Sequence, residues 1–406
     1  MRAIATKPAK TYLVVSTVLA LFPEAANYRY GIDIKLFYFV MCFNLLLLIL
    51  WWDWRLDRGM SFALAYVWLL GMASVLAGTN RAGIFLEQAV GISLTVFYFY
   101  LFFKYAGWDV EDLFDFYATV AYYVALIGLA RSAVLTIDTG EFAPVRSVMQ
   151  EPAHFATVVL PAAYYQVARV LRGRGSPTKA VVTGLAVLLS GSAIALIGAM
   201  IAFLLAARGR WRNVLITAPL VACLGVLVYH TNEHFRVRMD DSLHVLKTHN
   251  VREANLSTYA LLSNGYASIS ALKQHPLFGF GIGAHQLAHR AYIGHTPGSR
   301  YWGKYINWND TDASSMLLRA ASELGMVGLC LIGWFLYRCH VGGSSLEADI
   351  SAACITYFAL KLLREGHWFP PEMYFFVWTY VLVWRKTRQE GEISEAPAVA
   401  PAYSFS

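Results

Sequence analysis

Apolar runs of about 18 residues or more recur along most of this chain, and each is long enough to cross about 30 Å of hydrocarbon as a helix. Hydrophobic residues make up 57% of the sequence and charged residues only 15%, whereas a soluble domain usually carries about a quarter charged residues. A membrane barrel would need short alternating segments of about ten residues, which the sequence lacks. The pattern therefore predicts an all-α, polytopic helical membrane protein.

We expect about twelve spans. The run at residues 179–207 is long enough for one helix or two, but Ser190-Gly191-Ser192 interrupts it. Basic residues flank both ends of this run, and two short crossings keep both flanks on the same side of the membrane. The expected spans are about 11–24, 34–51, 60–77, 84–103, 112–135, 153–170, 179–190, 192–207, 213–230, 312–337, 348–364 and 371–384.

One long polar segment, from Tyr229 to about Asp312, interrupts the spans. It holds eight of the eleven histidines and an aromatic run at residues 301–308 that suits either sugar stacking or an interfacial belt. We therefore expect a membrane bundle at 1–230, a large loop with amphipathic helices at 231–311, the last three spans at 312–388 and a disordered tail at 389–406.

Charge predicts which side of the membrane this loop occupies. With twelve spans, the segments assigned to the cytoplasm hold roughly 17 Lys and Arg, and the short segments on the other side hold about 7. Positive charge favours the cytoplasm, so the large loop is expected on the outer, extracytoplasmic face. The net charge of +7 is then explained by cytoplasmic loops, and we expect no nucleic-acid partner.

The short outer loop before residue 153 supplies the first candidate residues. Arg146 suits an anionic ligand or the membrane surface, and His154 suits a ligand or an interfacial position. Glu151 precedes Pro152, where a helix is expected to begin. Its negative charge suits the helix dipole there, and it is also a candidate catalytic base.

The large loop supplies further arginines and a glycine-rich turn. A planar guanidinium fits a diphosphate with two parallel hydrogen bonds. Our candidates for such a contact are Arg252, Arg290 and Arg300, which flank the expected amphipathic helix and the glycine-rich turn. The turn Gly279-Phe-Gly-Ile-Gly283 follows an expected helix rather than a strand, so it is a tight turn and not a nucleotide-binding loop. The pair His285 and His289 lacks a neighbouring glutamate and a third ligand, so we expect no metal and no cofactor.

The last outer segments hold carboxylates and more basic residues. Asp312 lies at the entry to the tenth span, as a helix cap or a catalytic base. Arg319 and Glu323 are four residues apart, so they can pair inside the membrane, where charged residues often mark function. Arg364 and His367 lie in the short turn before the last span. A lipid with an anionic head suits such a surface, because arginines can stabilise a leaving pyrophosphate without a metal.

Three segments together resemble the O-antigen ligase and polymerase superfamily. They are the loop from Arg146 to Phe155, the turn His275-Pro-Leu-Phe-Gly-Phe-Gly-Ile-Gly283, and Ser322-Glu-Leu-Gly-Met-Val-Gly-Leu329. The family pairs such an "hPl.G.G" turn with a later helix ending in "E.G..G", and its span count is similar. The resemblance covers about residues 140–330.

The resemblance implies a metal-independent glycosyltransferase of the bacterial inner membrane with a periplasmic active site. Its donor and acceptor would be undecaprenyl-diphosphate-linked glycans, and a chain-length regulator or a flippase of the same pathway would be a possible partner. Arg146, and Arg252 or Arg290, carry over as donor diphosphate contacts. Family ligases have a His-Asn pair about ten residues before the "E.G", where this chain reads Ala313-Ser314-Ser315. This departure favours a polymerase of O-antigen or exopolysaccharide repeat units.

Other functions remain open from the sequence. A ligase that transfers glycan to lipid A core or another acceptor would use the same kind of site. A transporter of polysaccharide or lipid-linked sugar often shows a duplicated half, and no repeat is visible here. A structural partner in polysaccharide assembly is the remaining alternative.

Overall fold

The computed structural model of this chain describes residues 6–23, 28–29, 33–34, 36–53, 55–207, 219, 222–223, 225–227, 229–230, 233–248, 254–296 and 303–395. Within these residues the fold is helical apart from one very short antiparallel ladder, in which β1 (Tyr28–Arg29) pairs with β2 (Asp33–Ile34). The all-α prediction is confirmed.

Helices coincide with eleven of the twelve expected spans, while most of the expected span at 213–230 lies outside the described residues. The break expected inside 179–207 is present at Gly191, where φ is +62°. The helices are α1 (Lys7–Ala20), α2 (Leu36–Trp51), α3 (Arg58–Leu76), α4 (Ala82–Tyr105), α5 (Val110–Thr139), α6 (Pro152–Leu171), α7 (Pro177–Leu188), α8 (Ala193–Ala207), α13 (Met316–Arg338), α14 (Leu346–Leu363) and α15 (Pro371–Glu395).

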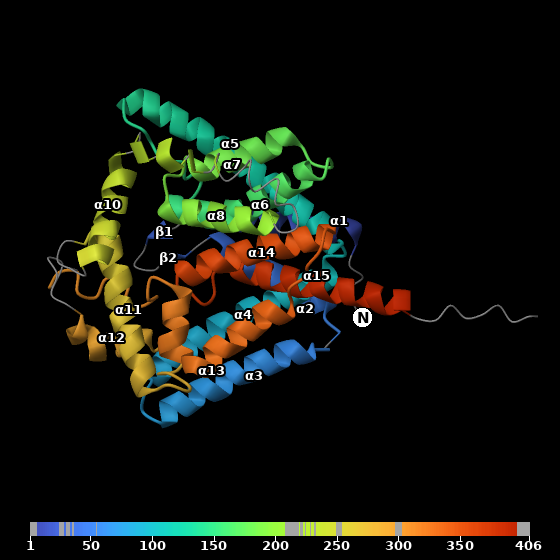
Figure 1. The fold of residues 1–406 in the computed structure, drawn as a ribbon. Helices are drawn as coiled ribbons and strands as arrows, with labels where there is room; N and C mark the ends of the chain where they lie inside the picture. Colours follow the sequence, from blue (N-terminus) through green and yellow to red (C-terminus); the bar gives the residue numbers. More distant parts are fainter. Residues whose placement is uncertain are drawn as a thin grey trace, which may run out of the picture.

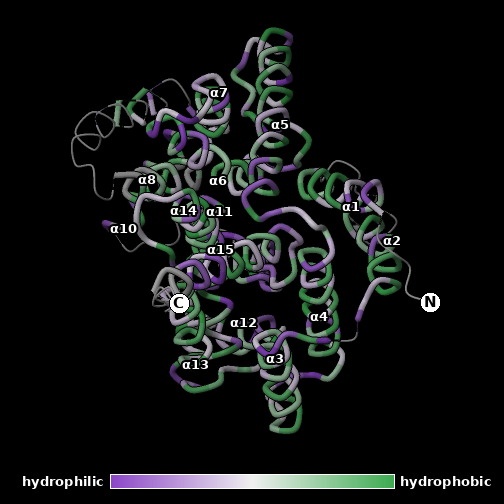
Figure 2. Tube along the Cα trace, turned by 90° about the vertical axis from the view of Figure 1, so that its right-hand side faces the viewer, coloured by the Kyte–Doolittle hydropathy of each residue, from purple (hydrophilic) through white to green (hydrophobic). Residues whose placement is uncertain are grey.

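Within the described part of the chain, α3, α4, α5 and α13 are long and apolar enough to cross a membrane. Large apolar side chains are exposed along them, such as Phe62 and Leu69 of α3 and Ile127 and Val134 of α5, and Figure 2 shows hydrophobic residues running along these helices. Water would disfavour so much exposed apolar surface. These features indicate a membrane protein, and the number of crossings stays a prediction.

Helices α6 and α14 form the centre of the bundle. Every residue of α6 from Phe155 to Gln166 is buried, and α6 packs against α5, α7, α8 and α14. Several of its buried residues are alanines, which let neighbouring helices approach closely. The central position of α6 and α14 holds their ends in fixed places.

Ion pairs show which helix ends lie together. At one end of the bundle, acidic residues near the starts of α3, α5 and α14 meet basic residues near the ends of α6 and α15. These pairs are Asp57–Arg385, Asp115–Arg169, Glu111–Lys386 and Asp349–Arg172. The starts of α6 and α15 and the end of α14 therefore lie at the opposite end of the bundle.

That opposite end also carries the polar segment. Figure 1 shows α10 (Glu233–Thr248), α11 (Leu256–Gln274) and α12 (His285–Tyr292) gathered at one end of the bundle, away from the end of α15. A short 3-10 helix, η2 (Ile293–His295), follows α12, and α11 and α12 both pack against α13. We call this the loop end of the bundle.

Two expected limits were wrong. Asp312 does not cap the tenth span: α13 begins at Met316, and the side chain of Ser315 accepts the hydrogen bond from Leu318 N. Helix α15 continues to Glu395, so the start of the expected disordered tail is helical, since Gln389 and Glu390 have good helix propensity. Residues 396–406 lie outside the described part of the chain.

Candidate active site at the loop end

The glycine-rich turn and the Glu-Leu-Gly segment interlock through their backbones. In a regular helix Met326 N would bond to Ser322 O, and Val327 N to Glu323 O. Gly325, with φ +62° and ψ −160°, interrupts α13 and frees these groups. Residues of the glycine-rich turn bond to these groups instead. Phe280 N donates to Ser322 O (2.8 Å) and Gly281 N donates to Glu323 O (2.9 Å). Met326 N donates to Pro276 O (2.8 Å) and Val327 N donates to Leu277 O (3.1 Å).

We call residues 276–281 and 322–327 the backbone clamp. Only glycine fits at its closest contacts. A Cβ at Gly279 would lie 2.5 Å from Ser322 O, and one at Gly325 would lie 2.6 Å from the backbone of Leu277. Both residues have positive φ, which glycine adopts at little cost. The two sequence motifs are thus the two halves of one structural unit.

The side chain of Glu323 holds the glycine-rich turn against α13. Its side chain is fully buried, and its carboxylate accepts hydrogen bonds from Gly283 N (2.8 Å), His285 N (3.2 Å), Arg319 Nε (2.8 Å) and Trp368 Nε1 (2.6 Å). The pairing of Arg319 with Glu323 is therefore confirmed. Arg319 balances the charge, and the three uncharged donors orient a carboxylate that burial would otherwise disfavour.

Arg319 is likewise occupied by protein groups. Its Nη1 donates to Gly366 O at 2.9 Å and its Nη2 to Gln88 Oε1 at 3.0 Å, and the side chain is only 3% exposed. It therefore ties α13 to α4 and to the loop after α14. Its expected contact with substrate stays a prediction, and its geometry favours positioning.

His285 and His289 lie under the clamp in α12 and are both fully buried. The ring nitrogens of His285 bond to Ser322 Oγ at 2.7 Å and Asn264 Oδ1 at 2.9 Å. Burial lowers the pKa of His285 well below its ordinary value, and the nearby Arg319 charge lowers it further. Burial also lowers the pKa of His289. Both imidazoles are therefore neutral near pH 7, which suits a structural role.

Asp312 sits in a strained turn in front of α13. Asn309, Ala313 and Ser314 all have positive φ, a conformation that side chains other than glycine's adopt at a cost and that clusters at functional sites. The turn directs the carboxylate of Asp312 toward His367, whose Nε2 lies 3.4 Å from Oδ2. The side chains of Asp312 and His367 are 15% and 60% exposed, so this pair is accessible.

A second carboxylate lies beside the first. Glu365 has a positive φ, and its backbone N donates to Ser314 O at 3.1 Å. Its carboxylate contacts His154 Nε2 at 3.3 Å and accepts a hydrogen bond from Lys361 Nζ at 3.0 Å. We call Asp312, His367, Glu365 and His154 the carboxylate–histidine cluster. It joins the start of α6, the turn before α13 and the loop after α14.

The structure places the expected arginines as follows. Arg146 is exposed in the loop before α6 and donates to Gln150 O at 3.4 Å. Arg290 is exposed on α12, 4.0 Å from Asp310. Arg364 is half-buried at the end of α14, and its side chain has no hydrogen-bond or ion-pair partner among the described residues. Arg252 and Arg300 lie outside the described residues.

Glu151 is the N-cap residue of α6, as expected from Pro152, but its side chain is exposed and makes no capping hydrogen bond. Of the residues expected at the site, the structure thus joins His154 to Glu365 and Asp312 to His367. Within the described residues, no group of three or more histidines, cysteines and carboxylates is arranged to hold a metal ion.

The sequence placed Glu365 in the outer turn before the last span without a role in the reaction, and Glu372 was overlooked. Glu372 lies in the first turn of α15 and is buried. Glu372 follows Pro371 whereas Glu151 precedes Pro152, and a glutamate next to a proline at the start of an expected span was the signal that could have found it. The contacts of Glu365 with His154 and Lys361 could be found only in the structure.

One comparison with known proteins supports the family resemblance. Residues 180–333 match the family model for O-antigen ligase. The match contains the whole backbone clamp together with Asp312, and it confirms the resemblance to the O-antigen ligase and polymerase superfamily. No curated protein matches the chain. His154, Glu365 and His367 lie outside the O-antigen ligase segment and join its site through the fold.

Proposed function

We propose that this protein polymerises undecaprenyl-diphosphate-linked oligosaccharide repeat units by metal-independent glycosyl transfer. The O-antigen ligase match supports this reaction class. The observation that carries the proposal is the accessible Asp312–His367 pair at the loop end of the bundle. A carboxylate held beside an imidazole at the loop end of a membrane bundle is suited to remove a proton from a hydroxyl.

The site would face the periplasm in a twelve-span arrangement within a bacterial inner membrane. Basic residues lie near the end of the bundle opposite the site, as Arg169, Arg172 and Arg385 do. Positively charged loops favour the cytoplasmic side, which leaves the loop end outside. The lipid tails of donor and acceptor would then stay in the bilayer while their glycans meet at the carboxylate–histidine cluster.

In the proposed reaction, the carboxylate of Asp312 takes the proton from an acceptor sugar hydroxyl. The hydroxyl oxygen attacks the anomeric carbon of the donor glycan, the bond from this carbon to the diphosphate oxygen breaks, and undecaprenyl diphosphate leaves with the electron pair. Arg146 and Arg290 would hold the diphosphate, because guanidinium groups stabilise the charge that develops on it. Glu151 stays the alternative base.

His367 bears on the choice between polymerase and ligase. The residues before the Glu-Leu-Gly segment lack the His-Asn pair of family ligases, yet His367 comes from another loop to lie 3.4 Å from Asp312. A histidine is therefore supplied by the fold where the local sequence lacks one. The name of the matching family also favours a ligase, so transfer to lipid A core or another acceptor is the second candidate function.

The test uses purified protein in lipid vesicles with lipid-linked repeat units, and it measures the length of the product glycans on gels. We expect the wild type to lengthen the units without an ion gradient. Asp312→Asn should reduce the rate by about a hundredfold or more, the usual range for a lost general base. Asp138→Asn, an exposed carboxylate at the end of α5, is the matched control and should leave the rate unchanged.

Each outcome separates the candidates. Product that forms only when lipid A core is added identifies a ligase. Movement of intact lipid-linked repeat units across the vesicle membrane, without a new glycosidic bond, identifies a transporter. Full activity of Asp312→Asn together with loss of activity in Glu151→Gln would move the base to Glu151, and full activity of both variants refutes the proposed chemistry.

A further inference from the structure

Two arginines at the end of the bundle opposite the candidate active site lie against one aromatic ring. Arg338 is the last residue of α13, and its guanidinium carbon lies 4.8 Å from the centre of the Trp384 ring. The guanidinium carbon of Arg388, on α15, lies 5.4 Å from the same centre. Both distances are within the range of cation–π attraction. We call Arg338, Trp384 and Arg388 the arginine–tryptophan group.

The packing of α15 against α13 fixes the position of this group. Tyr380, Trp384 and Arg388 follow one another at intervals of four residues, so they lie on one face of α15. On this face, Tyr380 donates a hydrogen bond from its hydroxyl to Leu336 O at 2.6 Å. The same face of α15 therefore contacts the last turns of α13, where Arg338 meets Trp384.

Neither arginine of the group is paired with an acid. The neighbouring Arg385 is paired with Asp57 at 2.8 Å, as is usual for the basic residues that join the helices at this end. Among the described residues, the side chains of Arg338 and Arg388 have no hydrogen-bond or ion-pair partner. Arg338 is half-buried and Arg388 is exposed, so their N–H groups remain available to an anion.

The group lies where a membrane surface is expected. Helix α13 is long and apolar enough to cross a membrane, and Arg338 ends it. In its last turns Trp334 and Tyr337 are 61% and 83% exposed. Exposed Trp and Tyr side chains at the end of an apolar helix are typical of the interface between bilayer and water. Arginine side chains at this level reach the lipid headgroups.

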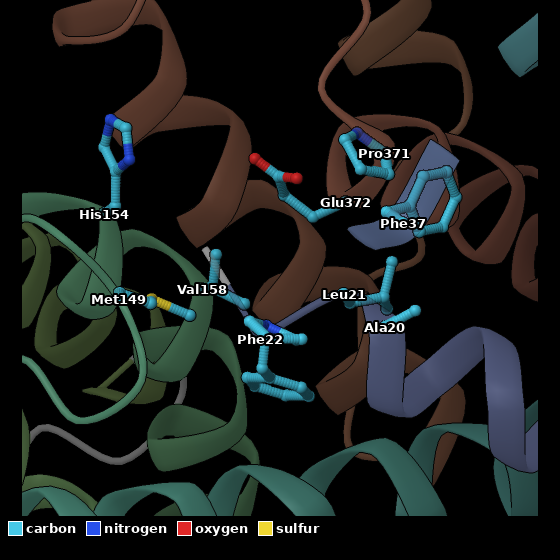
Figure 3. Close-up of a pocket in the computed structure, with 10 residues that line it drawn as sticks. Ala20, Leu21, Phe22, Phe37, Met149, His154, Val158, Pro371 and Glu372 are labelled. Carbon is cyan, nitrogen blue, oxygen red and sulfur yellow. The ribbon is translucent and has the colours of Figure 1, made fainter. Parts of the chain in front are cut away.

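The pocket at the other end of the bundle does not suit an anionic headgroup. It lies between α1, α6 and α15, and Phe22 and Met149 line it together with Glu372 (Figure 3). Its cavity volume of about 20 Å³ holds little more than one water molecule, and the negative charge of Glu372 repels a phosphate. Phosphate binding is therefore favoured at the arginine–tryptophan group.

We propose that the arginine–tryptophan group binds the headgroup phosphate of an anionic phospholipid in the leaflet opposite the loop end. Guanidinium groups bind phosphate oxygens through charge-assisted hydrogen bonds, and the Trp384 ring holds both of them in place before the lipid binds. The acyl chains would lie along the exposed apolar side of α13. The inference goes beyond the proposed reaction, because the donor diphosphate is expected at the loop end.

The test measures lipid binding to the purified full chain in detergent micelles by native mass spectrometry. The probes are phosphatidylglycerol, which is anionic, and phosphatidylcholine, which has no net charge. Arg338→Gln and Arg388→Gln should each raise the Kd for phosphatidylglycerol about fivefold, because one basic residue near a membrane surface contributes about that factor. The Kd for phosphatidylcholine should not change.

Two further variants distinguish a specific site from general positive charge. Trp384→Leu keeps both arginines but removes the ring that holds them, so it should also raise the Kd for phosphatidylglycerol, by about threefold. Arg174→Gln removes one charge from an exposed arginine just after α6, at the same end of the bundle. This control should bind both lipids as the wild type does.

Equal Kd values of the wild type for the two lipids would overturn the proposal. An effect of Arg174→Gln as large as that of the arginine variants would also overturn it, as would unchanged binding in a folded Trp384→Leu variant. Displacement of phosphatidylglycerol by excess glycerol phosphate would show a site for free phosphate and refute the lipid site. A wild type that binds phosphatidylglycerol but forms no glycosidic bond overturns only the proposed reaction and supports the lipid site.

Discussion

Replacing Glu323 by Gln should open the backbone clamp without unfolding the whole bundle. The Glu323 carboxylate accepts two backbone N–H groups and the side chains of Arg319 and Trp368. The amide of Gln keeps one acceptor oxygen but turns an N–H₂ group toward donors. It also leaves the buried guanidinium of Arg319 without its counter-charge.

The size of the effect follows from these contacts. Removing one partner of a buried ion pair costs about 3–5 kcal/mol, because the remaining charge is left buried and unpaired. At about 1.4 kcal/mol per factor of ten, the lower limit corresponds to roughly a hundredfold larger open population. The opening should stay local. Four backbone hydrogen bonds attach the turn to α13, whereas the rest of the bundle is stabilised by its own core.

Hydrogen exchange with peptide-level mass spectrometry measures this opening. Peptides that cover residues 276–290 and 319–328 should lose about a hundredfold in protection, while peptides from the middle of α6 should keep theirs. Glu390→Gln changes an exposed carboxylate near the end of α15 and is the matched control. Exchange at residues 276–290 that stays within threefold of the wild type would show that Glu323 does not hold the clamp.

Three more changes test other parts of the site. Gly325→Ala should lower the free energy of unfolding by about 2 kcal/mol or more, since a Cβ there would lie 2.6 Å from backbone atoms at a positive φ; an unchanged melting temperature would contradict this. Stability should fall as the pH drops below about 6.5, because the pKa of buried His285 and of His289 is lowered in the folded state and the unfolded chain binds protons that the folded chain does not; melting temperatures that are equal at pH 7.5 and 5.5 would rule this out. Arg364→Ala should keep the melting temperature and raise the KM for the donor, whereas Arg319→Ala should lower the melting temperature, and the reverse pattern would exchange their roles.

Much of the helical framework could be predicted from the sequence. Apolar runs mark most helices because a bilayer demands continuous apolar segments. The break at Gly191 and the glycine-rich turn were also predictable, since glycine takes backbone conformations that other residues avoid. The start of α13 was not predictable in the same way, because Asn309, Ala313 and Ser314 form a strained turn that no local preference indicates.

The site was less predictable than the framework. Candidate residues such as Asp312 and His367 were found because they lie at the ends of apolar spans on the face that the charge distribution predicts to be outside. Their pairing was not visible, since residues in contact come from loops far apart in the sequence. Glu372 was overlooked because a single glutamate after a proline looks like an ordinary helix start.

The backbone clamp has a consequence for how this protein family could diversify. The chain leaves the clamp after Gly281 and returns to it at Ser322. The two ends of the insert between these residues are therefore held together by the clamp. Lengthening such an insert costs little entropy once its ends are held together. Exchanging this insert for one from a family member with another glycan should therefore change sugar preference while the membrane framework stays intact.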